Sequence, residues 1–306
     1  MKKIAFLFLI LTTLSITAIA QTKKIDSLES ALKSATQDTT KLSILQSLSY
    51  KLENRNRLKS FDYAKQALAL AQKLNAKKQT GDCLNTLGDL YWFSGDYTEA
   101  SDHYYKALKI FESIKDEAGI ADSYRNIGWI YQGQANYKQT LSYYNKSLAI
   151  NKKLNAKRKM MANYDDFGIA YKLMGQYDSA IKYCNITIEL GKEISQSKGL
   201  ATGYGNLGSI YFEMGDYEKS IENFKKSNAI FIRDKDYFNL AEGYNGIGQN
   251  YLELKNADKT IENAEHAINP SLEHNYQQSI GTSYYLLAKA YSLKKDYIKA
   301  FTYLEK

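Results

Sequence analysis

A small residue recurs every forty positions along most of this 306-residue chain. The series reads Gly88, Gly128, Gly168, Gly208, Gly248 and Ala288. A tyrosine follows each member by three residues, at Tyr91, Tyr131, Tyr171, Tyr211, Tyr251 and Tyr291. Self-similarity at one period over about 200 residues predicts a solenoid, in which each repeat contacts only its neighbours. Solenoids commonly present an extended binding surface, so a reaction centre is not the first expectation. We call the six small residues the small-residue series.

Apolar residues within each repeat follow a helical spacing on both sides of a short turn. The set in one repeat is Leu84, Leu87 and Tyr91, then Gly95-Asp96-Tyr97, then Ala100, Tyr104, Ala107 and Leu108. Spacings of three, four and seven place each set on one stripe of a helix. The turn residues supply a helix stop and then an N-cap. The sequence therefore predicts an all-α fold of helix pairs, each with a first and a second helix.

The small-residue series needs a packing reason, because a glycine in mid-helix costs about 1 kcal/mol relative to alanine. We expect Gly88 and its equivalents to mark where the first helix of a pair admits the second. Ala100 and Ala107 would be the matching small sites on the second helix. The tyrosines would fill the space around these sites and keep their hydroxyl groups near an edge.

These residues resemble the tetratricopeptide repeat (TPR), whose pattern of a large residue, Leu, Gly, Tyr, Ala, aromatic and Ala they match in one register. The resemblance covers residues 41–306 as six full repeats and a partial seventh. It implies a right-handed superhelical solenoid of antiparallel helix pairs. The period here exceeds the common TPR period of about 34 residues, and we expect the additional residues to lengthen the second helix by about a turn or more.

Forty-residue repeats of this kind resemble those of kinesin light chains and of bacterial peptide-responsive regulators. They are also similar to the exported TPR sensor regions of Bacteroidota-type signalling proteins. The resemblance implies that the protein binds an extended peptide or a partner helix.

The ends of the array depart from the pattern. Residues 21–40 are expected to form an N-terminal capping helix and linker. The sixth repeat is expected to lose its turn at Lys255-Asn256-Ala257, and Pro270 to end its second helix early. The seventh repeat stops in mid-element at 297–306. We interpret the chain as the front part of a longer gene product, with a frayed natural C-terminus as the alternative.

Residues 1–20 form a separate segment. Lys2 and Lys3 precede an apolar stretch, and Ala18-Ile19-Ala20 precedes Gln21 in the pattern of a signal peptidase site. We predict a cleaved secretory signal peptide and a periplasmic or extracellular location. An uncleaved membrane anchor is the alternative, which several hydroxyl side chains within the apolar stretch disfavour. No later stretch is apolar and long enough to span a bilayer.

The net charge of +8 comes from 36 lysines and only five arginines among the 41 basic residues. Lysine is a strongly hydrated point charge, whereas arginine is the side chain that grips phosphate in a bidentate fork. The excess therefore indicates a solvated exterior, and we expect no nucleic-acid partner. The two cysteines, Cys83 and Cys184, lie about two and a half repeats apart, too far for the roughly 7 Å limit of a disulfide. We expect buried free thiols.

The sequence offers no recognisable catalytic set. Gly203 to Gly208 spells GxGxxG, but it falls inside a predicted first helix, whereas a dinucleotide site needs a preceding strand and a turn. His103, His266 and His274 are spread along the array without a cysteine or carboxylate at ligand spacing, so no metal site is expected. Asp165-Asp166 are adjacent helical residues, which do not face one another. We therefore predict neither an enzyme nor a cofactor.

Binding residues are predicted from the resemblance, because in TPR arrays the inner faces of the first helices line a groove. The predicted groove residues are Asn85, Trp92, Arg125, Asn126, Trp129, Asp165, Asn206 and Asn245. Both tryptophans of the chain are in this set, and Arg125 lies within a turn of Trp129. Aromatic and arginine side chains anchor interfaces, and asparagine can clamp a peptide backbone. Alternatively, the tryptophans simply pack against the next helix.

Two functions fit these observations. The first is the ligand-recognition part of an exported signal-transduction protein of the histidine-kinase type, whose membrane segment would follow downstream. The second is a free periplasmic or secreted scaffold for protein assembly. An enzyme is the weakest reading, because no catalytic set is present.

Overall fold

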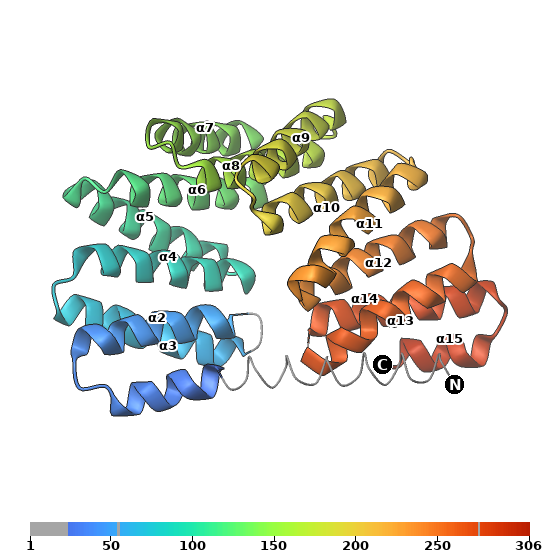
Figure 1. The fold of residues 1–306 in the computed structure, drawn as a ribbon, viewed down its shortest axis with the longest axis horizontal. Coiled ribbons are helices and arrows are strands. Elements are labelled where there is room, and N and C mark those ends of the chain that lie inside the picture. The colour runs from blue at the N-terminus through green and yellow to red at the C-terminus, as the bar shows by residue number, and fades with distance from the viewer. Residues whose placement is uncertain (1–23, 54–55, 275) are drawn as a thin grey trace. The chain divides into compact units, whose positions relative to one another are not determined.

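The computed structural model describes residues 24–53, 56–274 and 276–306. Every regular element in these ranges is a helix (Figure 1). The predicted signal peptide, residues 1–20, lies outside the described residues. The chain divides into two compact units, Met1–Ile130 and Tyr131–Lys306, which we call unit 1 and unit 2. None of the described helices is both long enough and apolar enough to cross a lipid bilayer.

Unit 1 is a stack of helix pairs in which α3 packs on α2 and on α4, and α4 packs on α5. Residues 24–34, within the range expected to cap the array, are helical, and Leu32 packs against the first core cluster. The labelled helices are α2 (Asp38–Leu52), α3 (Arg57–Lys73), α4 (Lys77–Phe93), α5 (Tyr97–Ile114) and α6 (Glu117–Gly133), the last of which ends in unit 2.

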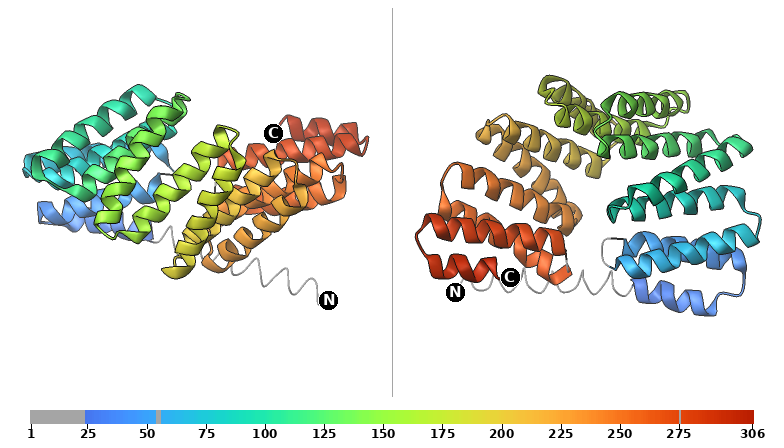
Figure 2. Two further views of the ribbon diagram at one scale, coloured as in Figure 1. Left: turned by 90° about the horizontal axis from the view of Figure 1, so that it is seen from above. Right: turned by 180° about the vertical axis from the view of Figure 1, so that it is seen from behind.

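Unit 2 has the same pairing, and its helices from α10 onward pack on one another in chain order (Figure 2, yellow to red). These helices are α7 (Tyr137–Lys153), α8 (Lys157–Leu173), α9 (Tyr177–Glu193), α10 (Ser197–Glu213), α11 (Tyr217–Asp234), α12 (Tyr237–Glu253), α13 (Ala257–His274), α14 (Gln277–Leu293) and α15 (Tyr297–Leu304). The even-numbered helices from α2 to α14 are the first helices of their pairs. The second helices α5 and α7 extend to Ile114 and Lys153, with 18 and 17 residues. The first helices α4 and α6 also have 17 residues each, so the long period gives two long helices in each pair.

The small-residue series lies where the two helices of a pair come closest, as predicted. A Cβ atom on Gly88 of α4 would lie 2.4 Å from the Tyr104 ring of α5. A Cβ atom on Gly208 of α10 would lie 2.9 Å from the Phe224 ring of α11. Tyr104 is itself fully buried. At Gly88 and Gly208 the small residue therefore leaves room for a large aromatic side chain on the second helix.

The turns between first and second helices repeat one geometry. The residue before the N-cap has a positive φ, 80° at Gly95, and Asp96 then accepts a hydrogen bond from the backbone N–H of Glu99 at 3.2 Å. The expectation that the sixth repeat loses this turn is wrong. Lys255 has φ 55°, and Asn256 caps α13 by accepting from the N–H of Lys259 at 3.1 Å. A non-glycine residue can adopt this conformation at a cost of about 1–2 kcal/mol, so the turn survives.

Pro270 does not end the second helix of the sixth repeat early, contrary to expectation. It lies inside α13, which continues to His274. A proline removes one intrahelical N–H and crowds the carbonyl four residues earlier. Tertiary packing holds the helix together across this defect, because Ile268 and Ser271 on either side are both buried.

Both cysteines are free and buried, as predicted. Burial raises the pKa of the Cys83 thiol to about 11 and that of Cys184 to about 12. Cys184 faces Gly168, whose Cβ would lie 3.0 Å from the sulfur, so this cysteine fills the position that Tyr104 fills in its own repeat. The thiols therefore act as small apolar core side chains.

Candidate functional site

The two tryptophans of the chain contact one another in unit 1. Trp92 of α4 and Trp129 of α6 have ring centroids 5.8 Å apart at an interplanar angle of 43°. Trp92 also meets the rings of Phe93 at 5.1 Å and Tyr97 at 6.4 Å. The side chains of Trp92 and Trp129 pack across two repeats, as the alternative interpretation expected, yet both residues stay partly exposed. The contact therefore joins two first helices and leaves ring surface for a partner.

Arg125 completes this cluster. Its guanidinium carbon lies 4.5 Å from the centroid of the Trp129 ring, within the range of a cation–π interaction. One turn of α6 separates the two residues, so the stacking is local and needs no other element. We call Trp92, Arg125 and Trp129 the tryptophan–arginine cluster. Stacking on the indole holds the guanidinium plane, and the planar fork of an arginine is the side-chain shape that matches a carboxylate.

A half-buried carboxylate, Asp89 of α4, makes contacts to α5 and α6. Its Oδ1 atom accepts from the Tyr104 hydroxyl at 2.8 Å and from the Asn126 amide at 3.4 Å. Desolvation raises the pKa of Asp89 to about 7, against the opposing effect of the Tyr104 hydrogen bond. The charges of Glu53 and Asp122 also raise this pKa, whereas that of Arg125 lowers it. The site therefore contains an acid that titrates near neutral pH.

Two predicted groove residues of unit 1 join neighbouring repeats. The Asn85 amide and the Ser123 hydroxyl lie 3.5 Å apart, close enough for a hydrogen bond between α4 and α6. Asn126 is buried and points at Asp89. Neither amide is free to clamp a peptide in this conformation, although both help to position the helices that carry the tryptophan–arginine cluster.

The predicted residues of unit 2 are also paired between repeats. The Asn206 amide of α10 donates to Asp165 of α8 at 2.6 Å. Asn245 of α12 is buried, donates to the Ser279 hydroxyl at 3.0 Å, and accepts from the Ser283 hydroxyl at 2.8 Å. These hydrogen bonds connect α12 to α14, and they use the donor and the acceptor of the Asn245 side chain within the fold.

A polar pocket of about 490 Å³ opens beside these residues in unit 2. Its walls come from α10, α11, α12 and α14, and α12 contacts both α10 and α14. Among the lining residues are the predicted Asn206 and Asn245, together with Gly205, Gly246, Gln249 and Glu242. We call this the α10–α12–α14 pocket. Its lining of amides and hydroxyls around a single carboxylate is suited to a polar ligand.

Glu242 is not among the site residues predicted from the sequence. Glu242 occupies the same repeat position as Asp82 and Asp122, 160 and 120 residues earlier, and all three are acidic. That recurrence is the signal that could have identified it. The pKa of Glu242 is raised by burial, while a hydrogen bond from Ser279 acts in the opposite direction.

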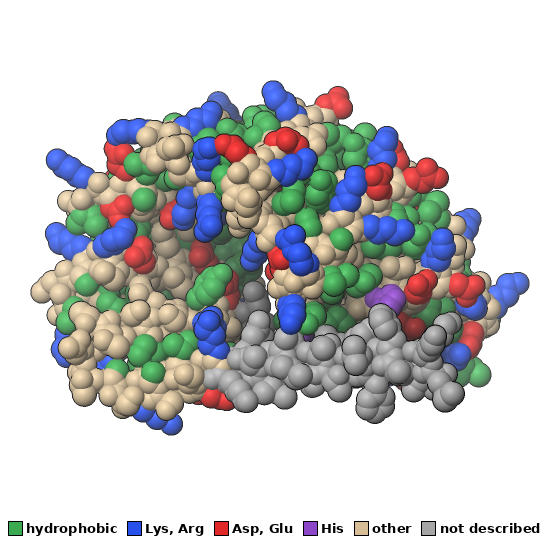
Figure 3. Space-filling view, in the orientation of Figure 1, with side chains coloured by type: hydrophobic (Ala, Val, Ile, Leu, Met, Phe, Trp, Pro, Cys, Tyr) green, Lys and Arg blue, Asp and Glu red, His purple; other side chains and the backbone are tan. Residues whose placement is uncertain are grey.

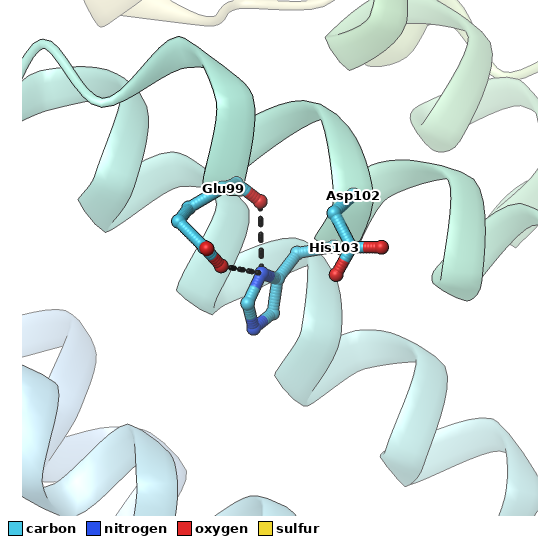
Figure 4. Close-up of side chains that lie close together, drawn as sticks. All are labelled: Glu99, Asp102 and His103. Atoms are coloured by element: carbon cyan, nitrogen blue, oxygen red, sulfur yellow. Dashed lines mark hydrogen bonds and ion pairs between the residues drawn. The ribbon is translucent and has the colours of Figure 1, made fainter.

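A carboxylate–histidine group lies on the surface of α5, and Figure 4 shows its three residues. Ligand atoms of Glu99, Asp102 and His103 lie within 4.8 Å of one another. The expectation that no carboxylate stands at ligand spacing from a histidine is therefore wrong, because Glu99 lies one turn before His103. His103 Nδ1 lies 2.8 Å from the carbonyl oxygen of Glu99, and Asp102 pairs with Lys106 at 2.5 Å. These contacts account for the group as ordinary helix-surface pairing.

The remaining motifs have structural explanations. GxGxxG lies within α10, as predicted, and a Cβ on Gly203 would lie 2.8 Å from Ile188. Each histidine stacks near a tyrosine, with ring centroids 5.2 Å apart for Tyr91 and His103 and 5.1 Å apart for Tyr244 and His266. On the face shown in Figure 3, Lys and Arg side chains stand among Asp and Glu side chains.

Comparison with protein families identifies the repeat. The tetratricopeptide repeat model matches residues 49–113, 94–153, 119–193, 159–233 and 199–269, and a second tetratricopeptide repeat model matches 281–306. The chain belongs to the tetratricopeptide repeat family. TPR proteins mediate protein binding, and the TPR fold is typically a non-catalytic interaction scaffold. No curated protein sequence matches this TPR chain.

Solved structures confirm the TPR fold at low sequence identity. A Rap protein complexed with competence and sporulation factor is 16% identical over 94% of this chain and 96% of its own, with a TM-score of 0.59. Aspartyl phosphate phosphatase F from Bacillus subtilis is 15% identical over 92% of this chain and 91% of its own, with a TM-score of 0.60. A signal transduction ATPase with a TPR sensor, from Pyrococcus horikoshii, is 20% identical over 87% of this chain, with a TM-score of 0.62. This chain spans 45% of that ATPase.

Proposed function

We propose that this TPR protein is exported and recognises a peptide or a segment of a partner protein as the sensor part of a signal-transduction protein. The observation that carries the binding role is the tryptophan–arginine cluster on α4 and α6. Three side chains of the types that anchor interfaces lie together there, partly exposed, on the first helices of adjacent repeats. A free periplasmic scaffold would use the same surface without signalling.

The comparisons support a sensor role by analogy of fold. One similar structure is described as a signal transduction ATPase with a TPR sensor, and another as a Rap protein in complex with competence and sporulation factor. Both are less than 25% identical to this chain, so their ligands are not transferred to it. They indicate that arrays of this kind serve in signalling, which favours a recognition role here.

The binding role is testable with a phage-displayed dodecapeptide library selected against the full chain. Since both tryptophans belong to the cluster, a peptide that docks there will change the tryptophan emission during titration. We expect Arg125→Ala and Trp129→Ala each to weaken the selected peptides at least about tenfold, as for residues at the centre of an interface. Lys109→Ala, an exposed change on the second helix α5 of the same unit, serves as the matched control.

Unchanged affinity in both Arg125→Ala and Trp129→Ala would place the binding site elsewhere.

Export is tested separately by expressing the full gene in a Gram-negative host and sequencing the N-terminus of the mature protein. A mature chain that begins at Gln21 supports export, and an unprocessed cytoplasmic chain contradicts it. Sequencing the gene beyond codon 306 separates the two modes of action. An apolar segment of about twenty residues and a kinase region would indicate a sensor, and an immediate stop codon a scaffold.

A further inference from the structure

The α10–α12–α14 pocket contains one ionisable side chain among its lining residues, Glu242. The other lining residues are amides, hydroxyls, glycines and two phenylalanines, and none of them is a lysine or arginine. Lys172 contacts one lining residue, because it donates to Ser209 at 2.9 Å, and it also lies 4.0 Å from Glu213. The pocket is therefore acidic, and no basic lining residue neutralises its carboxylate.

One oxygen of that carboxylate has its hydrogen-bonding capacity unused. Glu242 Oε1 is shielded from solvent and finds no hydrogen-bond partner among the described residues. A buried acceptor without a donor is costly, because it has lost its hydrogen bond to water and gained none in the fold. Glu242 as a whole is only half-buried and lines the pocket, so a ligand that enters beside it can bring a charged donor to this carboxylate. Such a donor would recover that cost, and its charge would favour ionised Glu242. This oxygen therefore contributes no hydrogen bond to the fold, and it is suited to accept one from a cationic ligand.

The walls leave room for a backbone beside that carboxylate. A Cβ on Gly205 would meet only the Ser227 hydroxyl, at 3.5 Å, so the α10 side of the pocket is open there. Gly205 stands two periods after Arg125, and Ser209 two periods after Trp129. The positions that carry large side chains in unit 1 therefore carry small ones in unit 2. Gln249 and Gln278 are exposed and line the rim, where each offers an amide donor and acceptor.

We propose that the α10–α12–α14 pocket binds a primary ammonium group carried by an extended peptide, with Glu242 as its counter-ion and the Gln249 and Gln278 amides on the peptide backbone. The ammonium group comes from a lysine side chain or from a free N-terminus. This inference rests on the proposed peptide-binding function and adds the class of ligand. It assigns unit 2 a recognition site separate from the tryptophan–arginine cluster of unit 1.

The test uses the full chain and a set of octapeptides built around one central lysine. Each peptide is made with lysine or acetyl-lysine at the centre, and with a free or acetylated N-terminus. Affinities are measured by isothermal titration calorimetry. We expect a free ammonium group to bind between about ten and a hundred times more tightly than its acetylated counterpart, the range for a hydrogen bond to a charged group. The position at which acetylation removes this preference identifies the source of the ammonium group.

The variant Glu242→Gln keeps the shape of the side chain and is expected to bind all four peptides equally. Gly205→Leu, which adds a large side chain to the α10 wall of the pocket and leaves Glu242 in place, should weaken every peptide. Gly281→Leu is its matched control, because Gly281 is an exposed glycine of α14 with open space around it. Since Glu242 Oε1 makes no hydrogen bond in the fold, Glu242→Gln should unfold at or above the wild-type temperature, as thermal denaturation will show.

An ammonium preference that persists in Glu242→Gln, or is absent from the wild type, overturns this proposal. Such a result leaves the proposed function intact if the peptides still bind and Trp129→Ala weakens them. If no peptide binds the wild type, the pocket proposal fails, and the dodecapeptide selection then decides the proposed function independently. The ammonium preference should persist in Trp129→Ala, because that residue belongs to the other unit.

Discussion

The two candidate surfaces use the same repeat positions in opposite ways. In unit 1, Arg125 and Trp129 fill the inner side of α6 with a stacked aromatic and cationic pair. In unit 2, the equivalent positions two periods later are Gly205 and Ser209, and a pocket opens there. The helices themselves are alike, because α6 and α10 both have seventeen residues. The comparison shows that the fold depends on the helix-pair interface, so the inner face is free to vary and to acquire different binding chemistry.

Thiol reactivity should give the largest difference between folded and unfolded protein, with one reporter in each unit. Cys83 lies in unit 1 and Cys184 in unit 2, and burial raises the pKa of both thiols. At pH 8 we expect each to react with a disulfide reagent such as DTNB more than about a hundredfold more slowly than an unfolded thiol, because the thiolate is the reactive form.

Measurement of these rates in increasing urea, in Cys83→Ser and Cys184→Ser separately, reports the opening of each unit by itself. Full denaturation should release both thiols. Rapid modification of either cysteine in buffer would contradict the burial on which the core assignment depends.

Two glycine substitutions should have opposite effects on stability. Gly88→Ala places a Cβ 2.4 Å from the Tyr104 ring and should lower the free energy of unfolding by about 2 kcal/mol, the usual cost of overpacking. Gly205→Ala meets only a contact at 3.5 Å and should raise it by up to about 1 kcal/mol, the helix propensity of alanine over glycine.

Urea unfolding followed by circular dichroism measures both effects. Tryptophan fluorescence adds a probe of unit 1 alone, because Trp92 and Trp129 both lie there. If Gly88→Ala were neutral, the tight helix contact would not explain the small-residue series. If Gly205→Ala were as harmful as Gly88→Ala, the α10 side of the pocket would not be open.

A pH-dependent effect concerns Asp89, which accepts hydrogen bonds from Tyr104 and Asn126 in unit 1. The pKa of Asp89 in the folded chain is about 7, above its ordinary value of 3.8. The folded state therefore holds this proton more tightly than the unfolded state. The associated stability is complete below about pH 4 and is lost as the pH rises to 7. Asp89→Asn removes the titration, so its stability relative to wild type should improve by on the order of 4 kcal/mol between pH 4 and pH 8.

Urea unfolding of wild type and Asp89→Asn at pH 4, 6 and 8 tests this pH dependence. Asp102→Asn provides the control, because Asp102 is an exposed carboxylate that pairs with Lys106 on the surface of α5. A constant difference between wild type and Asp89→Asn over this range would show that Asp89 titrates normally in the fold.

Much of the fold could be predicted because the residues that pack each helix pair are close in sequence and recur every forty residues. The helix pairs, the close approach at Gly88 and the buried thiols all follow from one forty-residue pattern. The errors occurred where a single residue was interpreted alone. Pro270 and Lys255 each break a local rule, and packing along α13 outweighs the cost. The carboxylate near His103 was overlooked, although its four-residue spacing is visible in the sequence.

The candidate site could be predicted only in part. The sequence placed Trp92, Arg125 and Trp129 on the first helices, and their contact follows from adjacent repeats. It could not show that Asn245 and Asn206 would be used to join one repeat to the next. Both side chains belong to types that bind peptides elsewhere, and only their distances to Ser279 and Asp165 reveal the internal role.

By itself, the sequence determined the repeat, the helix pairs and the residues that pack each pair, because these contacts lie at constant separations along the chain. Only the tertiary structure decided which inner-face groups pair between repeats, where the α10–α12–α14 pocket opens, and that Glu242 lines it. Those features depend on the offset and distance between neighbouring first helices. Small differences in side-chain packing set that offset, so it cannot be derived from the periodic sequence pattern alone.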